Sequence, residues 1–207
     1  MKVAAAINLH KALVIPVVLG LMWFFHNGST EAFIYLALHG SYSILWLIKG
    51  SLYPDKRFEE KRPVAISVIF IFLPLAGYYA APYLLISRSV VLAPPLIGFV
   101  LVLYIFGIFL HYVGDAQKHY VLQNKKGLIE DGLFARTRNP NYLGEIMIYT
   151  AYAAMSMHWL PFVILGAWVF GFFVRNMLSK DQSLSRYPQF AEYKKKTGLL
   201  FPKLFRA

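Results

Sequence analysis

The chain has 207 residues, of which 58% are hydrophobic and 15% are charged, and its formal net charge is +11. A soluble globular domain needs a more highly charged surface, so this composition excludes one. The basic residues punctuate apolar runs, whereas a nucleic-acid-binding protein clusters them on a soluble fold, so nucleic acid is excluded as a partner. The chain has no cysteine, which excludes disulfides, thiolate metal sites and a thiol nucleophile.

Six apolar segments follow one another along the chain, and each approaches the roughly 20 residues that a helix needs to cross a bilayer. In chain order they are His10–Phe25, Glu31–Lys49, Val64–Ala81, Leu92–Val113, Tyr142–Met157 and Trp159–Leu178. The pattern predicts an all-α fold: a polytopic membrane helix bundle of about six transmembrane helices, with a cofactor loop facing the cytoplasm.

No linker-like stretch interrupts the chain, so we expect a single membrane domain. Its predicted parts are four N-terminal spans (1–113), a cytoplasmic or re-entrant loop (114–141), two C-terminal spans (142–178) and an amphipathic tail (179–207). With six spans, the Lys and Arg residues lie on or nearest one side, Arg88 excepted, and the positive-inside rule places both termini on the cytoplasmic side. We expect the tail to be either a membrane-surface helix or a lid over a cytoplasmic cavity.

The loop before the fifth segment ends in a pattern that suits an anion. Asn139-Pro140 is typical of a helix start, because Asn caps free N–H groups and Pro is favoured at the first helical position. A helix N-terminus attracts negative charge, and Arg136 and Arg138 come directly before it. The pattern predicts a site for a phosphate-bearing ligand, although the same arginines could simply set topology and contact lipid headgroups.

Further polar residues surround this helix start. Asn141 and Glu145 share one helix face, and a carboxylate at the depth of Glu145 usually serves a site or pairs with a partner such as Arg175. Asp115 and Gln117, with Lys118, form a second polar cluster where the fourth segment ends. The sequence shows no His/Asp/Glu set with the spacing of metal ligands, so we expect no metal.

Residues Asp115–Glu145 carry the pattern D-x-Q-K … G-L-I-x-x-G-L-F … R-x-R-N-P-N-Y-L-G-E, and the tail carries R-Y-P-x-F-x-x-Y-K-x-x-T-x-x-L-F-P. This half of the chain resembles the steroid 5α-reductase C-terminal family of steroid-reductase-like membrane proteins. The wider superfamily also contains isoprenylcysteine and phospholipid methyltransferases, which carry an E-E pair after the last span where this chain has Lys180-Asp181.

The resemblance implies NADPH as the cofactor, or S-adenosylmethionine if the chain is a methyltransferase. The residues that it implies at the cofactor are Asp115, Gln117, Asn141, Tyr142 and Glu145, with Arg136, Arg138 and Arg175 near its phosphates. In the second segment, His39 matches a histidine of the steroid reductases, but Gly40 replaces the expected tyrosine and the early Gln-Glu pair is missing. We expect His39 and Tyr42 as catalytic residues, with Tyr42 as the acid unless it is only a packed core residue.

The resulting hypothesis is an NADPH-dependent membrane reductase of a C=C bond conjugated to a carbonyl in a lipid or steroid-like substrate. Two alternatives stay open: an S-adenosylmethionine-dependent lipid or prenyl-protein methyltransferase, and a catalytically degenerate structural subunit of a larger membrane complex. The expected partners are the lipid bilayer and an apolar, lipid-like substrate. The expected location is the endoplasmic reticulum for a eukaryotic source, or else a mitochondrial or bacterial inner membrane.

Overall fold

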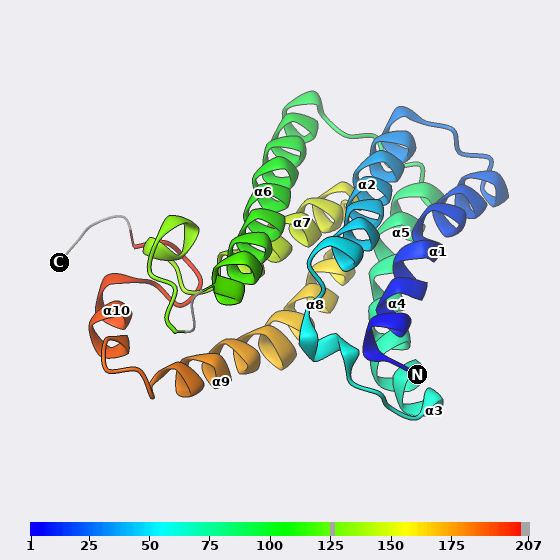
Figure 1. The fold of residues 1–207 in the computed structure, drawn as a ribbon. Coiled ribbons are helices and arrows are strands. Elements are labelled where there is room, and N and C mark those ends of the chain that lie inside the picture. Colours follow the sequence, from blue (N-terminus) through cyan, green and yellow to red (C-terminus); the bar gives the residue numbers. More distant parts are fainter. Residues whose placement is uncertain (125–126, 204–207) are drawn as a thin grey trace. The chain divides into compact units, whose positions relative to one another are not determined.

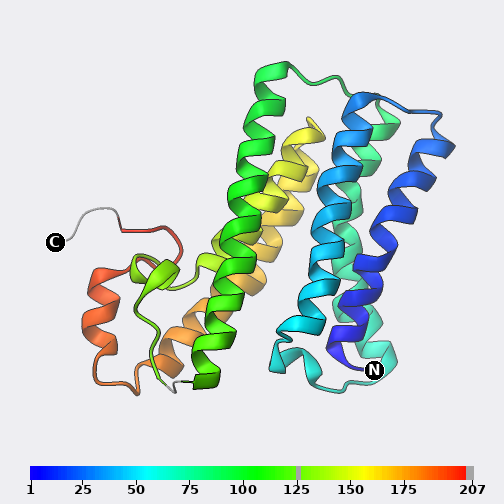
Figure 2. The ribbon, with the colours of Figure 1, turned by 45° about the horizontal axis from the view of Figure 1, so that its top comes forward.

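A computed structural model describes residues 1–124 and 127–203, and the regular structure of these residues is helical. Figures 1 and 2 show the helices as a ribbon coloured along the sequence. Contacts divide the chain into two compact units. Unit 1 comprises Met1–Val102 and Thr150–Ile164, and unit 2 comprises Leu103–Tyr149 and the described residues from Leu165 onward. The expectation of one membrane domain stays a prediction.

Five helices are long and apolar enough to cross a membrane, which confirms the predicted all-α membrane bundle. They span Val3–Phe24, Thr30–Leu52, Val64–Ser87, Pro94–Asn124 and Trp159–Leu184. The predicted fifth span is the exception, because α7 (Pro140–Met155) has 16 residues. At 1.5 Å per residue α7 is about 24 Å long, less than the roughly 30 Å of a hydrocarbon core.

The first two spans, α1 (Val3–Phe24) and α2 (Thr30–Leu52), pack together in unit 1. Helix α1 begins earlier than predicted, because the alanines that follow Val3 are strong helix formers. Helix α2 begins where predicted, and the Ser29 hydroxyl caps it by accepting from the Ala32 N–H at 3.3 Å. A Cβ on Gly40 would lie 3.2 Å from the Ile15 side chain, so the two helices approach closely there.

The third span is continuous but irregular. It consists of α3 (Val64–Ser67), the π-helical turn η2 (Val68–Phe72), α4 (Leu73–Ala76), the 3₁₀ turn η3 (Gly77–Tyr79) and α5 (Ala80–Ser87). Pro74 and Pro82 lie within it, and neither can donate a hydrogen bond to the preceding turn. Changes of helix type at such points keep the chain helical past the prolines.

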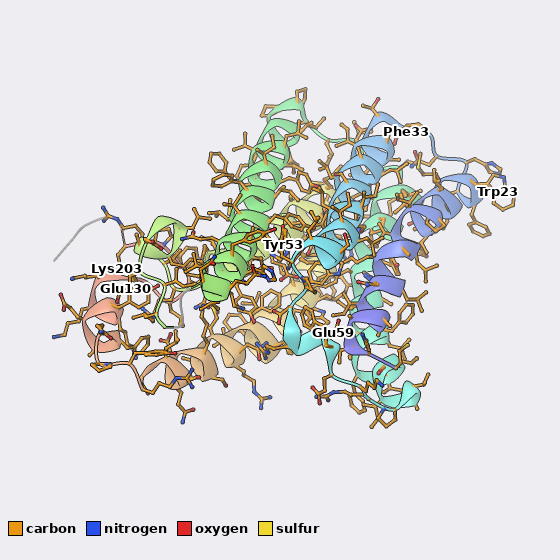
Figure 3. All side chains as sticks on the ribbon, viewed as in Figure 1. Trp23, Phe33, Tyr53, Glu59, Glu130 and Lys203 are labelled. Atoms are coloured by element: carbon orange, nitrogen blue, oxygen red, sulfur yellow. The ribbon has the colours of Figure 1, made fainter. Side chains whose placement is uncertain are left out.

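Hydrogen bonds join separate segments of the chain at the two ends of unit 1. At one end the N-terminal ammonium donates to the Arg62 carbonyl at 2.6 Å, so the N-terminus lies beside the loop that follows α2. At the other end the Asn27 amide donates to the Ile86 carbonyl at 2.8 Å, which joins the α1–α2 connection to the end of α5. Trp23 and Phe33, near this second end, are exposed and point away from the bundle (Figure 3), as expected of lipid-facing side chains.

In unit 2, the polar loop predicted to begin at residue 114 is helical in its first part. Helix α6 (Pro94–Asn124) continues well past the predicted end at Val113, because Ala116, Gln117 and Lys118 favour helix although they are not all apolar. The chain then forms the 3₁₀ turn η4 (Gly132–Ala135) before α7 begins. Residues 125–126 of the predicted loop and 204–207 of the predicted tail lie outside the described residues.

The last span continues into the tail. It consists of α8 (Trp159–Trp168), the π-helical turn η5 (Val169–Phe173) and α9 (Val174–Leu184). A short helix, α10 (Phe190–Lys196), follows, and Phe190 and Tyr193 on it are buried. These two side chains of the predicted amphipathic tail therefore face protein.

Candidate cofactor site

Helices α6 and α7 cross at glycines within unit 2. A Cβ on Gly107 would lie 2.8 Å from the Gly144 carbonyl oxygen, and a Cβ on Gly144 would collide with the Gly107 oxygen and the His111 backbone nitrogen. Small residues allow two helix backbones to approach this closely inside a membrane. The His111 Nδ1 also lies 3.2 Å from the Asn141 carbonyl oxygen. The crossing therefore fixes how the two helices present their polar side chains to each other.

Two predicted cofactor residues meet beside this crossing. The Asn141 amide, on the first turn of α7, donates to the Asp115 Oδ1 on α6 at 3.0 Å. Gly114 lies beside this contact, and a Cβ there would be 3.4 Å from the Asn141 backbone nitrogen, an ordinary contact distance. Asp115 and Asn141 are both half-buried, so each keeps part of its polar group accessible. The structure thus joins residues that lie far apart in the sequence.

The remaining predicted residues of α7 lie on its first two turns. Glu145 follows Asn141 by one helical turn and is half-buried. The Tyr142 ring packs against Phe173 of η5, with ring centroids 5.0 Å apart. Arg175, on α9, is exposed, and its pairing with Glu145 stays a prediction.

Gln117 holds the loop that follows α6. Its Oε1 accepts from the Leu133 N–H at 3.1 Å, and its Nε2 donates to the Asp131 carbonyl at 3.0 Å. Gly132 lies between these partners with a positive φ of 54°, and a Cβ there would lie 2.5 Å from Gln117 Nε2. Both polar atoms of the Gln117 side chain bind the protein itself. We therefore assign Gln117 to positioning this loop, and its expected contact with a cofactor stays a prediction.

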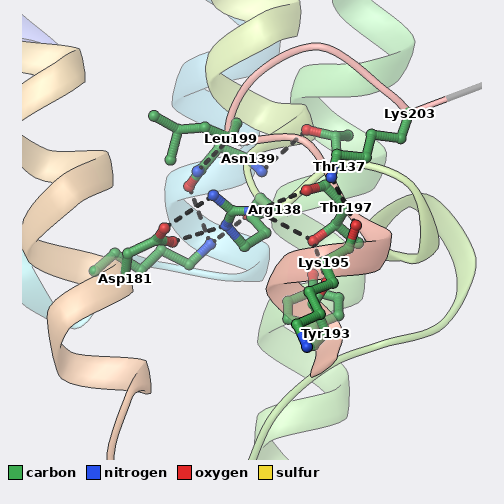
Figure 4. A network of polar contacts seen from close by, with 10 residues as sticks. Thr137, Arg138, Asn139, Asp181, Tyr193, Lys195, Thr197, Leu199 and Lys203 are labelled. Carbon is green, nitrogen blue, oxygen red and sulfur yellow. Dashed lines mark hydrogen bonds and ion pairs between the residues drawn. The ribbon is translucent and has the colours of Figure 1, made fainter. Parts of the chain in front are cut away.

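Arg138 forms a buried ion pair within unit 2 (Figure 4). Its Nε donates to Asp181 Oδ1 at 2.9 Å, and a second guanidinium nitrogen lies 2.9 Å from Asp181 Oδ2. A third nitrogen donates to the Thr197 carbonyl at 2.8 Å, and the residue is only 5% exposed. Opening such a pair leaves a buried charge and costs about 3–5 kcal/mol. We therefore assign Arg138 to this internal pair, and its expected contact with a ligand phosphate stays a prediction.

Arg136 differs from Arg138 in its surroundings. Its side chain is exposed, and one guanidinium nitrogen donates to the Lys203 carbonyl at 3.3 Å. Its backbone carbonyl accepts from the N–H groups of Gly198 and Lys203, each at 3.0 Å. The backbone of Arg136 is thus fixed by the tail while its charge faces outward. Of the two arginines before α7, Arg136 is the exposed one.

The tail after α10 runs along residues 136–139. The Thr137 hydroxyl donates to the Leu200 carbonyl at 2.7 Å, and the Asn139 amide donates to the Leu199 carbonyl at 2.8 Å (Figure 4). These bonds, with an isolated parallel bridge between Thr137 and Gly198, satisfy the backbone of the tail. The tail therefore belongs to the folded core of unit 2 and supports the start of α7.

Helix α10 adds a contact to the same loop. The Tyr193 hydroxyl donates to the Phe134 carbonyl at 2.9 Å. Burial raises the pKa of Tyr193 well above its ordinary value, so the hydroxyl keeps its proton and remains a donor at neutral pH. The inner side chains of α10 pack on protein, and the choice between a membrane-surface helix and a lid stays a prediction.

Lys180 and Asp181 are the polar residues that the sequence did not assign to this site. Lys180 Nζ donates to the Arg138 carbonyl at 2.7 Å and to the Asn139 Oδ1 at 3.1 Å. With the Arg138 pair, these bonds tie α9 to the first residues of α7. In the sequence, Lys180-Asp181 served only to distinguish the chain from the methyltransferases, which carry an E-E pair there. The partners of these two residues lie about forty residues earlier, so no local pattern could reveal them.

The two predicted catalytic residues lie on α2 in unit 1. His39 is fully buried, its Nδ1 lies 3.1 Å from the Tyr35 hydroxyl, and its ring stacks on Tyr152 at 4.5 Å between centroids. Tyr42 is also fully buried, and the Lys11 ammonium lies 4.2 Å from the centroid of its ring. Tyr35 could have been found from the sequence, since it precedes His39 by one helical turn. Lys11 and Tyr152 could not, because they come from other helices.

Comparisons with known proteins identify a family of unknown function. No solved structure matches the chain. An uncharacterized protein of Schizosaccharomyces pombe is 35% identical over 57 residues, which are 26% of this chain and 20% of that protein, so the match spans about a fifth of the relative's length. A family model described as a protein of unknown function, DUF1295, matches residues 55–197, which is more than half of the chain. The chain therefore belongs to the DUF1295 family.

Proposed function

We propose that the chain is an NADPH-dependent membrane reductase that saturates a C=C bond conjugated to a carbonyl in a lipid-like substrate. The observation that carries this proposal is the hydrogen bond between Asn141 and Asp115 at the α6–α7 crossing, with Glu145 one turn further along α7. These are three of the residues that the resemblance to steroid 5α-reductases implies at the cofactor. The matched family region, residues 55–197, contains all three.

The chemistry of these side chains fits a pyridine nucleotide. Asp115 and Glu145 can accept from hydroxyl and amide groups, Asn141 can both donate and accept, and the exposed Arg136 guanidinium suits a phosphate. When bound, NADPH supplies a hydride to the β carbon of the enone, while a proton is added to the α carbon. In this proposal a side-chain acid supplies that proton.

One observation favours S-adenosylmethionine as the second candidate. Arg138 is committed to Asp181, which leaves Arg136 alone of the two arginines to meet phosphates. S-adenosylmethionine has no phosphate, so a methyltransferase would not need a pair of arginines there. The Asp115–Asn141 pair could hold its ribose or amino-acid groups equally well.

Binding to the purified protein separates these candidates. NADPH or S-adenosylmethionine at about 100 times its dissociation constant should stabilise the folded protein by about 2.7 kcal/mol. We expect NADPH to raise the melting temperature, and Glu145→Gln to abolish this effect without preventing insertion or folding. Glu130→Gln is the matched control, because it removes the same charge from an exposed loop position in unit 2.

Each of the other outcomes of this binding experiment would support a different conclusion. Stabilisation by S-adenosylmethionine alone would replace the reductase with the methyltransferase. Stabilisation by neither ligand would favour a structural subunit without a cofactor. Equal NADPH affinity in the wild type and Glu145→Gln would remove Glu145 from the site.

A further inference from the structure

The His39 ring is fixed inside unit 1 on two sides. Its Nδ1 lies 3.1 Å from the Tyr35 hydroxyl one turn earlier on α2. Its face stacks on the Tyr152 ring, 4.5 Å away and tilted by 25°, and the Tyr152 hydroxyl donates to the Leu38 carbonyl at 3.2 Å. Tyr35 and His39 are each 0% exposed. A hydrogen bond, a stacking contact and complete burial together leave the ring one orientation.

The Tyr35 bond also determines which nitrogen of His39 carries the hydrogen. Within the described residues, His39 Nδ1 is the one hydrogen-bond partner of the Tyr35 hydroxyl. If Nδ1 donated to Tyr35, the tyrosine hydrogen would be buried without an acceptor, which is strongly unfavourable. Tyr35 therefore donates to Nδ1, and the hydrogen of the neutral imidazole lies on Nε2.

His39 Nε2 has no hydrogen-bond partner among the described residues although it is buried. The Ser43 hydroxyl, one helical turn further along the same face of α2, is 1% exposed and also lacks a partner there. His10 of α1 is fully buried and close enough to act electrostatically on His39. Buried donors are almost always satisfied in native proteins, and polar side chains within membrane helices usually serve a site.

We propose that His39 Nε2–H and the Ser43 hydroxyl bind the carbonyl oxygen of an apolar ligand within unit 1. A donor that is oriented in advance and shielded from water suits an acceptor without a hydrogen of its own, such as a ketone or aldehyde. In this arrangement His39 is a substrate-binding residue, and Tyr35 and Tyr152 are positioning residues that act through it. The choice of an enone rests on the proposed reductase.

The test compares two probes of nearly the same shape, cholestenone, which has a conjugated carbonyl, and the parent hydrocarbon cholestene. Binding to the full-length protein in detergent is measured without any cofactor, and the carbonyl stretch of bound cholestenone is recorded by infrared spectroscopy. We expect cholestenone to bind about tenfold more tightly than cholestene, the effect of one net hydrogen bond. The carbonyl stretch should move to lower wavenumber in the wild type.

Variants of His39 test whether its side chain makes the hydrogen bond to the carbonyl oxygen. His39→Leu should weaken cholestenone binding about tenfold and return the stretch towards its value in an apolar solvent, with cholestene affinity unchanged. His39→Gln, whose amide nitrogen can take the place of Nε2, should restore part of the shift and also tests the site if His39→Leu does not fold. Ser41→Ala is the matched control, because the exposed Ser41 hydroxyl on the same helix donates to the Ala37 carbonyl.

Equal affinity for the two probes, or an unshifted stretch in the bound wild type, would overturn the inference. The same holds if His39→Leu folds and keeps the shift. These results would leave the cofactor proposal intact as long as NADPH still raised the melting temperature. If NADPH did not raise the melting temperature but the carbonyl stretch was still shifted, the reductase proposal would fail and the carbonyl site would stand.

Discussion

Replacing Arg138 with Gln should destabilise unit 2 strongly, because the change leaves Asp181 as a buried charge without its partner. The guanidinium makes two contacts of 2.9 Å with the carboxylate, and Arg138 and Asp181 side chains are only 5% and 8% exposed. Solvent therefore cannot replace the lost partner. Removing one member of such a pair costs about 3–5 kcal/mol.

Thermal unfolding in detergent can measure this loss. For a chain of this size, about 3–5 kcal/mol corresponds to a melting temperature lower by roughly 6–20 °C. Arg136→Gln is the matched control, because Arg136 is exposed and should lose less than about 0.5 kcal/mol. The double variant Arg138→Gln/Asp181→Asn should recover part of the loss, since no unpaired charge remains.

The reasoning would be refuted if folded Arg138→Gln lost less than about 1 kcal/mol. It would also fail if the double variant were as unstable as the sum of the two single variants, because a coupled pair is not additive. A fully stable Arg138→Gln that had lost NADPH binding would return Arg138 to the ligand and restore a two-arginine phosphate site.

Three further predictions concern packing, pH and topology. Gly144→Ala should cost about 1–3 kcal/mol by overpacking the α6–α7 crossing, whereas Gly166→Ala, with nothing within 4 Å of the added carbon, should be neutral or slightly stabilising in the same unfolding assay. Since burial raises the pKa of Tyr193 above the value of about 10 in unfolded chains, its contribution to stability is complete below about pH 10 and is lost above it. The difference in melting temperature between wild type and Tyr193→Phe should therefore be constant up to about pH 10 and shrink beyond it, and a flat difference would contradict this. Single cysteines at Ser29 and Gln123 should react with an impermeant maleimide from opposite sides of the membrane, and labelling from one side would overturn the topology.

The sequence predicted the features of the fold that depend on residues close together in the chain. Apolar runs of about 20 residues located the five spans, each within two residues at one of its two ends, and Ser29 marks the start of α2 as an N-cap should. The prediction was wrong where composition was used as a helix boundary. Helix α6 continues past Val113 because a polar residue does not break a helix, and α7 is shorter than a full span although its composition is apolar.

Only the local geometry of the candidate site could be predicted from the sequence. Asn141 and Glu145 share a helix face, so their register follows from the helical period. The role of Arg138 could not be predicted, because its partner Asp181 lies 43 positions later and is brought to it by α9. The tautomer of His39 likewise depends on the packed structure, in which Tyr35 has no second hydrogen-bond partner among the described residues.

The most direct test of the proposed function is isotope transfer in a single reaction. The purified protein would be incubated with cholestenone and NADPH that carries deuterium at the transferable position of the nicotinamide, and the product would be analysed by mass spectrometry and NMR. The account predicts a saturated ketone with one deuterium at the β carbon in the wild type and a product yield lower by at least about tenfold in Glu145→Gln, since the lost interaction is worth about 1.4 kcal/mol or more. Unlabelled cholestenone recovered from a folded protein that binds both NADPH and the enone would contradict it.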